Sequence, residues 1–137
     1  MISFRAQLLA ACLVATLLGC GGDGLSYKAA KVAGTVTLDD APIEKGVINF
    51  ISEEKTGGAA GEDSAEIVGG KFSASKVPVG KVRMFVIASK ETGKMIPGSS
   101  TDIPETVSII PAHYSQGIEV TISGDETDRK IELRSSP

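Results

Sequence analysis

The chain has 137 residues and contains no tryptophan, only two cysteines and one histidine, while aromatic residues make up 4% of it. With so few aromatic side chains, the core has to come from valine, isoleucine, leucine, alanine and a few phenylalanines. A formal net charge of −3 provides no excess positive charge for a phosphate backbone, so we expect no nucleic-acid partner. The length suits one globular domain.

Catalytic and metal-binding motifs are also lacking. No HExxH, CxxC or GxSxG motif occurs, and the single histidine, His113, cannot by itself supply a zinc site or a Ser-His-Asp set. We expect a structural or surface role for His113, and we predict a non-enzyme with no catalytic, cofactor-binding or metal-binding residue. Three clusters of carboxylates occur, but none matches the sequence of a calcium-binding loop, so we expect them to be solvated turns. These clusters are Asp39-Asp40, Glu62-Asp63 and 125–128.

The beginning of the chain reads as a signal peptide. Arg5 precedes an apolar run from Leu8 to Leu18. As a helix this run would be roughly 16 Å long at ~1.5 Å per residue, about half of a ~30 Å hydrocarbon core, so a permanent transmembrane helix is the weaker interpretation. Leu17-Leu18-Gly19-Cys20 then resembles the bacterial lipobox. This implies that Cys20 is lipidated and becomes the mature N-terminus; an ordinary secretory leader is the alternative.

A lipidated Cys20 would anchor the domain stably on a membrane, because each buried CH₂ of its acyl chains contributes ~0.8 kcal/mol. Cys12 lies in the leader, so no disulfide is available. Residue 21 is glycine and not the aspartate of the familiar inner-membrane retention signal, which favours the outer membrane. We therefore predict a signal peptide at 1–19, a lipidated cysteine and flexible tether at 20–31, and a β domain at 32–137.

From Val32 onward, short runs of alternating apolar and polar residues are separated by glycine and proline, a pattern typical of β-strands, and no helical period extends over three turns. We expect Asp39–Pro42 to turn the chain as a hairpin or a sheet-to-sheet crossover, and Glu53–Asp63 and Glu91–Glu105 to be loops. The spacing predicts an antiparallel β-sandwich. The expected strands are 32–38, 47–51, a hairpin at 64–75 that turns at Gly69-Gly70, 81–89, 118–123 and 130–134. Residues expected to face the core are Val36, Phe50, Phe72, Val86, Val120 and Leu133, with Glu119 and Lys130 outside.

Several short stretches carry a family resemblance through their order and spacing. After Cys20 these are Gly34–Leu38, Asp40–Ile43, Gly46–Phe50, Gly70–Phe72, Val77–Gly80 and Ile110–Tyr114. Together they resemble the small planctomycete-type lipoproteins with a carboxypeptidase-regulatory-like, or transthyretin-like, domain. The resemblance implies a Greek-key β-sandwich of about seven strands. The chain departs from the pattern at Lys71, where the family usually has Asp-Gly before an aromatic, and at His113, where lysine is common.

The anchor, the fold and the missing catalytic set predict a membrane-anchored extracytoplasmic lipoprotein whose non-catalytic domain binds an envelope protein or a glycan. A passive structural envelope protein is the alternative. A hydrolase on a transthyretin-like scaffold, such as hydroxyisourate hydrolase, is less favoured, because that class ends in Tyr-Arg-Gly-Ser and needs several histidines. We expect contact through 91–114, with simple disorder as the alternative, and we expect Tyr114 to pin a corner of the sandwich.

Overall fold

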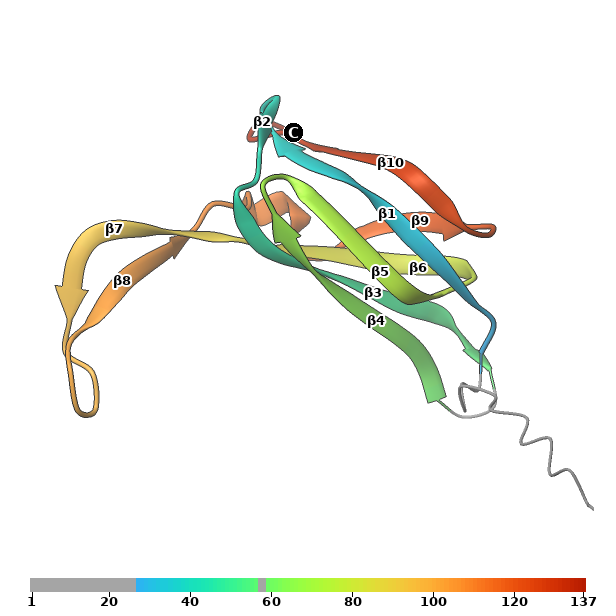
Figure 1. The fold of residues 1–137 in the computed structure, drawn as a ribbon, viewed down its shortest axis with the longest axis horizontal. Helices are drawn as coiled ribbons and strands as arrows, with labels where there is room; N and C mark the ends of the chain where they lie inside the picture. Colours follow the sequence, from blue (N-terminus) through green and yellow to red (C-terminus); the bar gives the residue numbers. More distant parts are fainter. Residues whose placement is uncertain (1–26, 57–58) are drawn as a thin grey trace, which may run out of the picture.

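The computed structural model describes residues 27–56 and 59–137. This part of the chain is all-β, with one 3-10 helix, η1 (Ala112–Tyr114), and no α-helix (Figure 1). The prediction of an antiparallel all-β domain is therefore confirmed. The strands are β1 (Ala29–Leu38), β2 (Ala41–Pro42), β3 (Lys45–Thr56), β4 (Ala59–Val68), β5 (Lys71–Pro78), β6 (Gly80–Ile87), β7 (Ser89–Ile96), β8 (Ile103–Ser108), β9 (Ile118–Ile122) and β10 (Glu126–Leu133).

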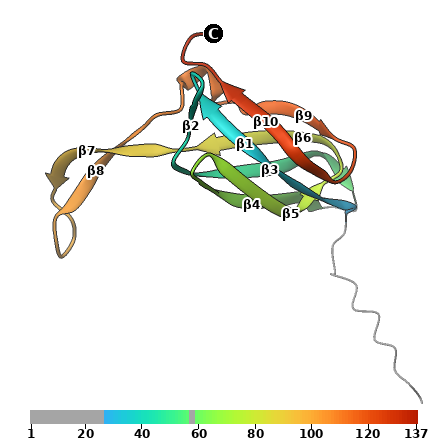
Figure 2. The ribbon, with the colours of Figure 1, turned by 45° about the horizontal axis from the view of Figure 1, so that its top comes forward.

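Eight of these strands form one sheet in the order β10-β1-β5-β4-β3-β6-β9, with β2 paired to β1. Its pairings are antiparallel except for the parallel pair β1–β10. The sheet curls like half a barrel, so that its two halves face each other across the core (Figure 2). Two separate sheets were expected. Instead, the hairpin that turns at Gly69-Gly70 keeps β4 and β5 side by side and joins the two halves.

The first connection begins as the predicted hairpin, and the crossover that follows stays within one sheet and does not lead to a second one. Asp39 and Asp40 adopt positive φ angles of 50° and 68°, the conformation of a tight two-residue hairpin turn, and pair β1 with the short β2. The chain then crosses to β3, which is not a neighbour of β1. The backbone N–H of Ile43 donates to the carbonyl oxygen of Val36 at 3.1 Å and fixes the start of this crossover.

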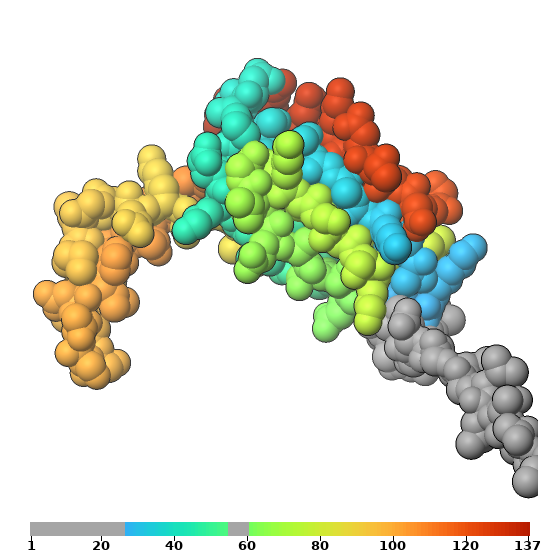
Figure 3. Space-filling view, in the orientation of Figure 1, coloured from blue at the N-terminus to red at the C-terminus, as the bar shows by residue number. Residues whose placement is uncertain are grey.

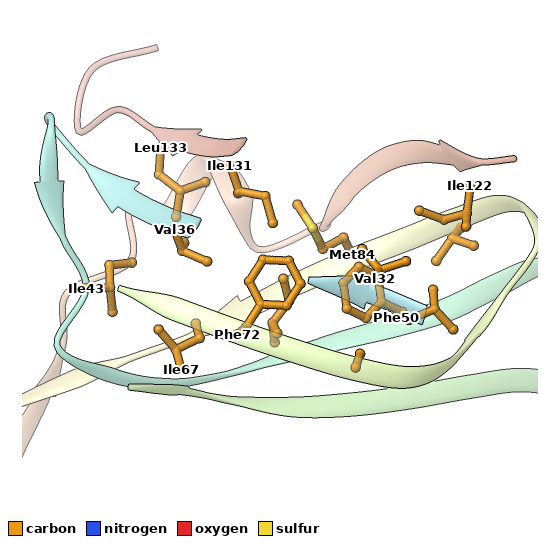
Figure 4. Packing of buried hydrophobic residues seen from close by; sticks show 14 of the residues in the cluster. Val32, Val36, Ile43, Phe50, Ile67, Phe72, Met84, Ile122, Ile131 and Leu133 are labelled. Atoms are coloured by element: carbon orange, nitrogen blue, oxygen red, sulfur yellow. The ribbon is translucent and has the colours of Figure 1, made fainter. Parts of the chain in front are cut away.

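The core lies inside the curl and is built from aliphatic side chains with two phenylalanines (Figure 4). Val36, Phe50, Phe72 and Leu133 are buried as predicted. Val86 and Val120 are half-buried and pack against this core, while Glu119 and Lys130 are exposed. The period-two alternation therefore predicted the register correctly. The buried residues are Ala30, Val32, Val36, Ile43, Ile48, Phe50, Ile67, Phe72, Ala74, Val77, Val82, Met84, Ala88, Ile122, Ile131 and Leu133.

Two predicted loops are strands in the structure. In the first, Glu53–Asp63, the described residues belong to extensions of β3 and β4, which pair beyond a register shift between Ile51 and Lys55. The second, Glu91–Glu105, forms most of the hairpin β7–β8, which is a separate two-stranded sheet. We call residues 89–108 the arm.

The turn residues that suggested a loop in the second segment have specific places in the arm. Pro97 and Gly98 lie in the connection between β7 and β8. Gly93 has a positive φ of 82° within the register shift between Glu91 and Met95. Pro104 lies on β8, which has a neighbour on one side only, and such edge strands tolerate proline because one row of backbone groups is unpaired.

Candidate interaction surface

The arm leaves the sheet at the end opposite to the first described residues. Ala29 on β1 pairs with Pro78, whereas the arm follows Ile87, which pairs with Val47 near the far end of β3. Figure 1 shows the arm and the start of β1 at opposite ends of the described structure. At the base of the arm, Ser89 pairs with Ser108, and the N–H of Ile109 donates to the carbonyl oxygen of Ala88 at 3.0 Å.

The arm exposes large apolar side chains. Met95 is 58% exposed, Ile103 50%, Val107 42% and Ile96 38%, whereas the side chains of the core are at most 5% exposed. The space-filling view shows the arm standing clear of the body (Figure 3). A hairpin of two strands is marginally stable in water, and clustered exposed apolar residues commonly mark an interaction site.

One face of the arm concentrates three of these residues. Ile96 pairs with Ile103 and Lys90 pairs with Val107, and directly paired residues point to the same side of a hairpin. Because side chains alternate along a strand, Ile103, Glu105 and Val107 lie on that side too. We call the side with Lys90, Ile96, Ile103, Glu105 and Val107 the inner face of the arm, since Lys90 follows the buried Ala88 by two residues.

A second apolar surface lies on the outer side of β3 and β6. Val47 pairs with Ile87 and Asn49 with Phe85, so these side chains share a face, and Val47 and Ile87 are exposed. Two adjoining hollows mark this surface, one of about 520 Å³ and one of about 450 Å³, and Ile87 lines both. We call this surface the outer groove. Its principal lining residues are Val47, Ile51, Phe85, Ile87, Ile110 and Tyr114.

Carboxylates flank the outer groove on β4. Glu66 pairs with Val47, and Glu62 pairs with Ile51, so both acidic side chains lie on the same side of the sheet as the groove. Both are exposed, and neither forms an ion pair with a side chain of the described ranges. One edge of the groove is therefore acidic.

His113 and Tyr114 lie together on η1. Their rings are 4.2 Å apart between centroids, and His113 is exposed. The hydroxyl of Tyr114 accepts a hydrogen bond of 2.9 Å from the backbone N–H of Arg134, which fastens η1 to the end of β10. Tyr114 thus pins a corner of the fold, as predicted. Within residues 27–56 and 59–137, no three His, Cys, Asp or Glu side chains gather in a way that holds a metal ion.

The predicted acidic turns hold backbone groups in place. Asp39 accepts a hydrogen bond from the N–H of Ser135 at 2.9 Å, which holds the pKa of this carboxyl below its ordinary value. The carboxylate of Asp40 pairs with the Arg134 guanidinium at 2.7 Å, and this contact lowers the pKa of Asp40. Both contacts fasten the end of β10 to the β1–β2 turn.

The other two acidic clusters act similarly. Asp63 accepts from the N–H of Lys76 at 2.7 Å, and Asp125 accepts from the N–H of Lys31 at 2.8 Å. These carboxylates link neighbouring strands through single backbone contacts. The interpretation as turn residues is correct for Asp39-Asp40, whereas Glu62-Asp63 lies on β4 and most of 125–128 lies on β10.

Tyr27 has a role that the sequence interpretation missed. Its hydroxyl lies 3.0 Å from the carbonyl oxygens of both Glu62 and Lys76, and its ring lies so close to Gly61 that a Cβ there would approach ring atoms to 2.7 Å. Burial raises the pKa of Tyr27, and the charges of Asp63 and Glu62 add to this effect. β1 begins at Ala29, three residues before the predicted boundary at Val32. The signal in the sequence for this role of Tyr27 is a lone aromatic residue that follows a glycine-rich stretch.

Cys20 and the signal peptide lie outside the described residues, so their predicted roles remain predictions. In the described part of the chain, no helix has the length and hydrophobicity needed to span a membrane.

Comparison with protein-family models finds no match, and comparison with curated proteins finds none either. Among solved structures, the chain is similar to a 9R-lipoxygenase from Cyanothece PCC8801, with 9% sequence identity and a TM-score of 0.39. This similarity covers 77% of the chain but only 16% of the lipoxygenase. At this level the match supports no conclusion about activity.

Proposed function

We propose that the protein is a membrane-anchored extracytoplasmic lipoprotein whose β domain is a non-catalytic interaction module of the cell envelope. The observation that carries the proposal is the arm, which projects from the sheet with Met95, Ile96, Ile103 and Val107 exposed. An apolar hairpin that stands clear of its own domain gains stability when a partner covers it.

The direction of the arm fits an anchor on Cys20. The described chain begins at Tyr27, at the end of the sheet opposite to the arm. With the lipid of Cys20 in the outer membrane, the arm points away from the bilayer that holds the anchor, into the periplasm or the exterior. The partner of the arm is then an envelope protein or an envelope glycan and not the anchoring membrane.

We also propose that the curled sheet is a variant of the carboxypeptidase-regulatory-like, transthyretin-like sandwich. In support, the sheet path contains seven strands, and its two ends, β9 and β10, do not pair with each other. The short β2 and the arm are additions to this set of seven. The sequence motifs from Gly34 to Tyr114 support the same family.

A pull-down of the full-length protein from its native envelope, with mass spectrometry of the recovered material, tests the proposal. The informative variant replaces residues 90–107 by Asn-Gly. Ser89 and Ser108 are register partners, so a two-residue turn closes the shortened hairpin without strain. The matched control is Glu119→Gln, an exposed change on β9.

We expect the wild-type protein and Glu119→Gln to recover the same partner, and the variant without the arm to lose it while its circular dichroism and thermal midpoint stay close to the wild type. Purified envelope glycan, sedimented with each form, separates a glycan from a protein partner. If all three forms recover the same material, the arm is not the contact surface. If none recovers any, the passive structural role is the better assignment.

A further inference from the structure

Two short connections attach the arm to the body of the domain. Ala88 joins β6 to β7, and residues 109–111 join β8 to η1. The two-stranded sheet of the arm pairs with no strand of the main sheet. Within the described part of the chain, the side chains of residues 89–107 also form no hydrogen bond or ion pair with the body. The angle between the arm and the sheet therefore depends on how these two connections are held.

The first connection is held by the core. Ala88 is buried, and Ile87 just before it pairs with Val47 on β3. Packing around Ala88 is tight, since a Cβ on Gly46 would lie 3.0 Å from the Cβ of Ala88. Hinges are formed by a few residues at the ends of elements, and Ala88, where β6 leaves its neighbours in the sheet, is such a position. The second connection has to restrain the bending that this hinge permits.

The second connection is held through η1. Ile110 and Tyr114 are half-buried and pack against the core. η1 itself has only three residues and no side-chain cap, so its own hydrogen bonds hold it weakly. The Tyr114 hydroxyl ties η1 to the end of β10, because it accepts the backbone N–H of Arg134 at 2.9 Å. The arm is thereby connected, through a few residues, to Arg134.

Arg134 is held in turn by the β1–β2 turn. Its guanidinium pairs with Asp40 at 2.7 Å, and the N–H of Ser135 donates to Asp39 at 2.9 Å. The N–H of Asp39 also donates to the carbonyl oxygen of Leu133 at 2.9 Å. These contacts bring together three segments that are far apart in the sequence. We call the residues that make them through their side chains or accept from them the clasp: Asp39, Asp40, Tyr114, Arg134 and Ser135.

A hollow lies between the base of the arm and the β1–β2 hairpin. It has a volume of about 460 Å³, and Pro42, Ile43, Lys90 and Ile109 are among the residues that line it. The hollow leaves space into which the base of the arm can move when the restraint through η1 is lost. Direct packing against β2 therefore does not replace the clasp.

We propose that the clasp fixes the angle at which the arm leaves the sheet, with Tyr114 as the positioning residue, and that loss of the Tyr114–Arg134 contact lets the arm swing about Ala88. This goes beyond the proposed function, because the clasp restrains the arm whether or not a partner is bound. An arm that is held at one angle loses less conformational freedom when it binds, so the clasp prepares the arm for contact.

Distances between pairs of spin labels, measured by double electron–electron resonance, test the proposal. The protein is the full-length chain with its two native cysteines replaced by serine. One labelled pair, Lys71→Cys with Lys94→Cys, joins the body to the arm. A reference pair, Lys71→Cys with Glu119→Cys, lies within the body. All three positions are exposed, so the labels do not disturb the core.

Tyr114→Phe is the informative variant, because it removes only the hydroxyl that contacts Arg134. We expect it to widen the arm-to-body distance distribution at least twofold and to leave the reference distribution unchanged. Tyr27→Phe is the matched control. It removes a hydroxyl that lies 3.0 Å from two backbone carbonyl oxygens at the opposite end of the sheet, and it should leave both distributions as in the wild type.

Arg134→Met acts on the other side of the clasp. It removes the ion pair with Asp40 and keeps the backbone N–H that Tyr114 accepts. We expect Arg134→Met to widen the arm-to-body distribution by less than Tyr114→Phe does. The double variant should be no wider than Tyr114→Phe alone, because changes within one network of contacts do not add. Arg134→Met also decides the question if Tyr114→Phe does not fold.

Three results overturn the proposal. The first is an arm-to-body distribution that is as narrow in Tyr114→Phe and Arg134→Met as in the wild type. The second is equal widening in Tyr27→Phe, which would show that any lost hydroxyl contact has this effect. The third is equal widening of the reference pair, which would mean that the whole domain loosens and that the clasp does not act on the arm.

Discussion

The rings of Phe50 and Phe72 lie 6.0 Å apart between centroids and are tilted by 40°, although Phe50 is on β3 and Phe72 on β5. Both side chains are buried, and the contact joins the two strands that flank β4. It therefore holds the bend of the curled sheet from the inside.

Truncation of either ring should destabilise the domain strongly. We expect Phe72→Ala or Phe50→Ala to lower the free energy of unfolding by about 3–5 kcal/mol, through lost burial and the remaining cavity. Glu119→Ala and Lys130→Ala, on the exposed side, should change it by less than about 0.5 kcal/mol. Urea unfolding of residues 27–137 measures both. Equal losses at Glu119 and Phe72 would contradict the observed register.

Acid should loosen the contact between the β1–β2 turn and the end of β10. The folded pKa values of Asp39 and Asp40 lie below their ordinary values, so the stabilisation they give is present above the unfolded pKa of about 4 and is lost as the pH falls through the folded values. Asp39→Asn with Asp40→Asn should flatten the fall of the thermal midpoint below about pH 4. An unchanged slope in the double variant would assign the acid sensitivity to other carboxyls.

The two glycines between β4 and β5 should respond differently to substitution. A Cβ on Gly70 would lie 2.6 Å from the Cβ of Pro42, whereas a Cβ on Gly69 meets nothing within 4 Å. Both have positive φ, so each alanine adds backbone strain of about 1 kcal/mol, and Gly70→Ala adds a steric clash. Urea unfolding should show a larger loss for Gly70→Ala. Equal losses would mean that Pro42 and β2 move aside freely.

Lipidation of Cys20 is tested by metabolic labelling with a fatty-acid analogue in a bacterial host. The wild-type chain should be labelled and should fractionate with membranes, and Cys20→Ser should lose both properties. A Cys12→Ser variant is the matched control, because Cys12 lies in the predicted leader. Label that persists in Cys20→Ser would exclude this lipid anchor.

The alternation of apolar residues predicted most strands and the core, because burial of one sheet face leaves a local period of two in the sequence. Val36, Phe72 and Leu133 illustrate this. The continuous sheet was not predictable in the same way. Whether β4 and β5 stay paired through the bend depends on sheet curvature and on the packing of Phe50 against Phe72, which no local pattern records.

The arm was missed for a different reason. Gly93, Pro97, Gly98 and Pro104 give the segment the composition of a loop. Only the pairing of β7 with β8 shows that Gly93 lies in a bulge, Pro97 and Gly98 in the connection, and Pro104 on an edge strand. The expectation that this segment carries the contact surface rested on the rarity of long irregular connections and on the apolar residues Met95, Ile96, Ile103 and Ile109. Of these, Ile96 and Ile103 pair on one face of the hairpin.

The placement of Tyr27 and the arm at opposite ends of the sheet has a mechanical consequence. A pull between an anchored N-terminus and a partner on the arm is directed along the strands, while the hydrogen bonds between antiparallel strands run across them. Such a load shears many backbone hydrogen bonds together and does not open them one after another. With the proposed anchor on Cys20 and a partner on the arm, the domain would therefore carry tension between the two along its strands.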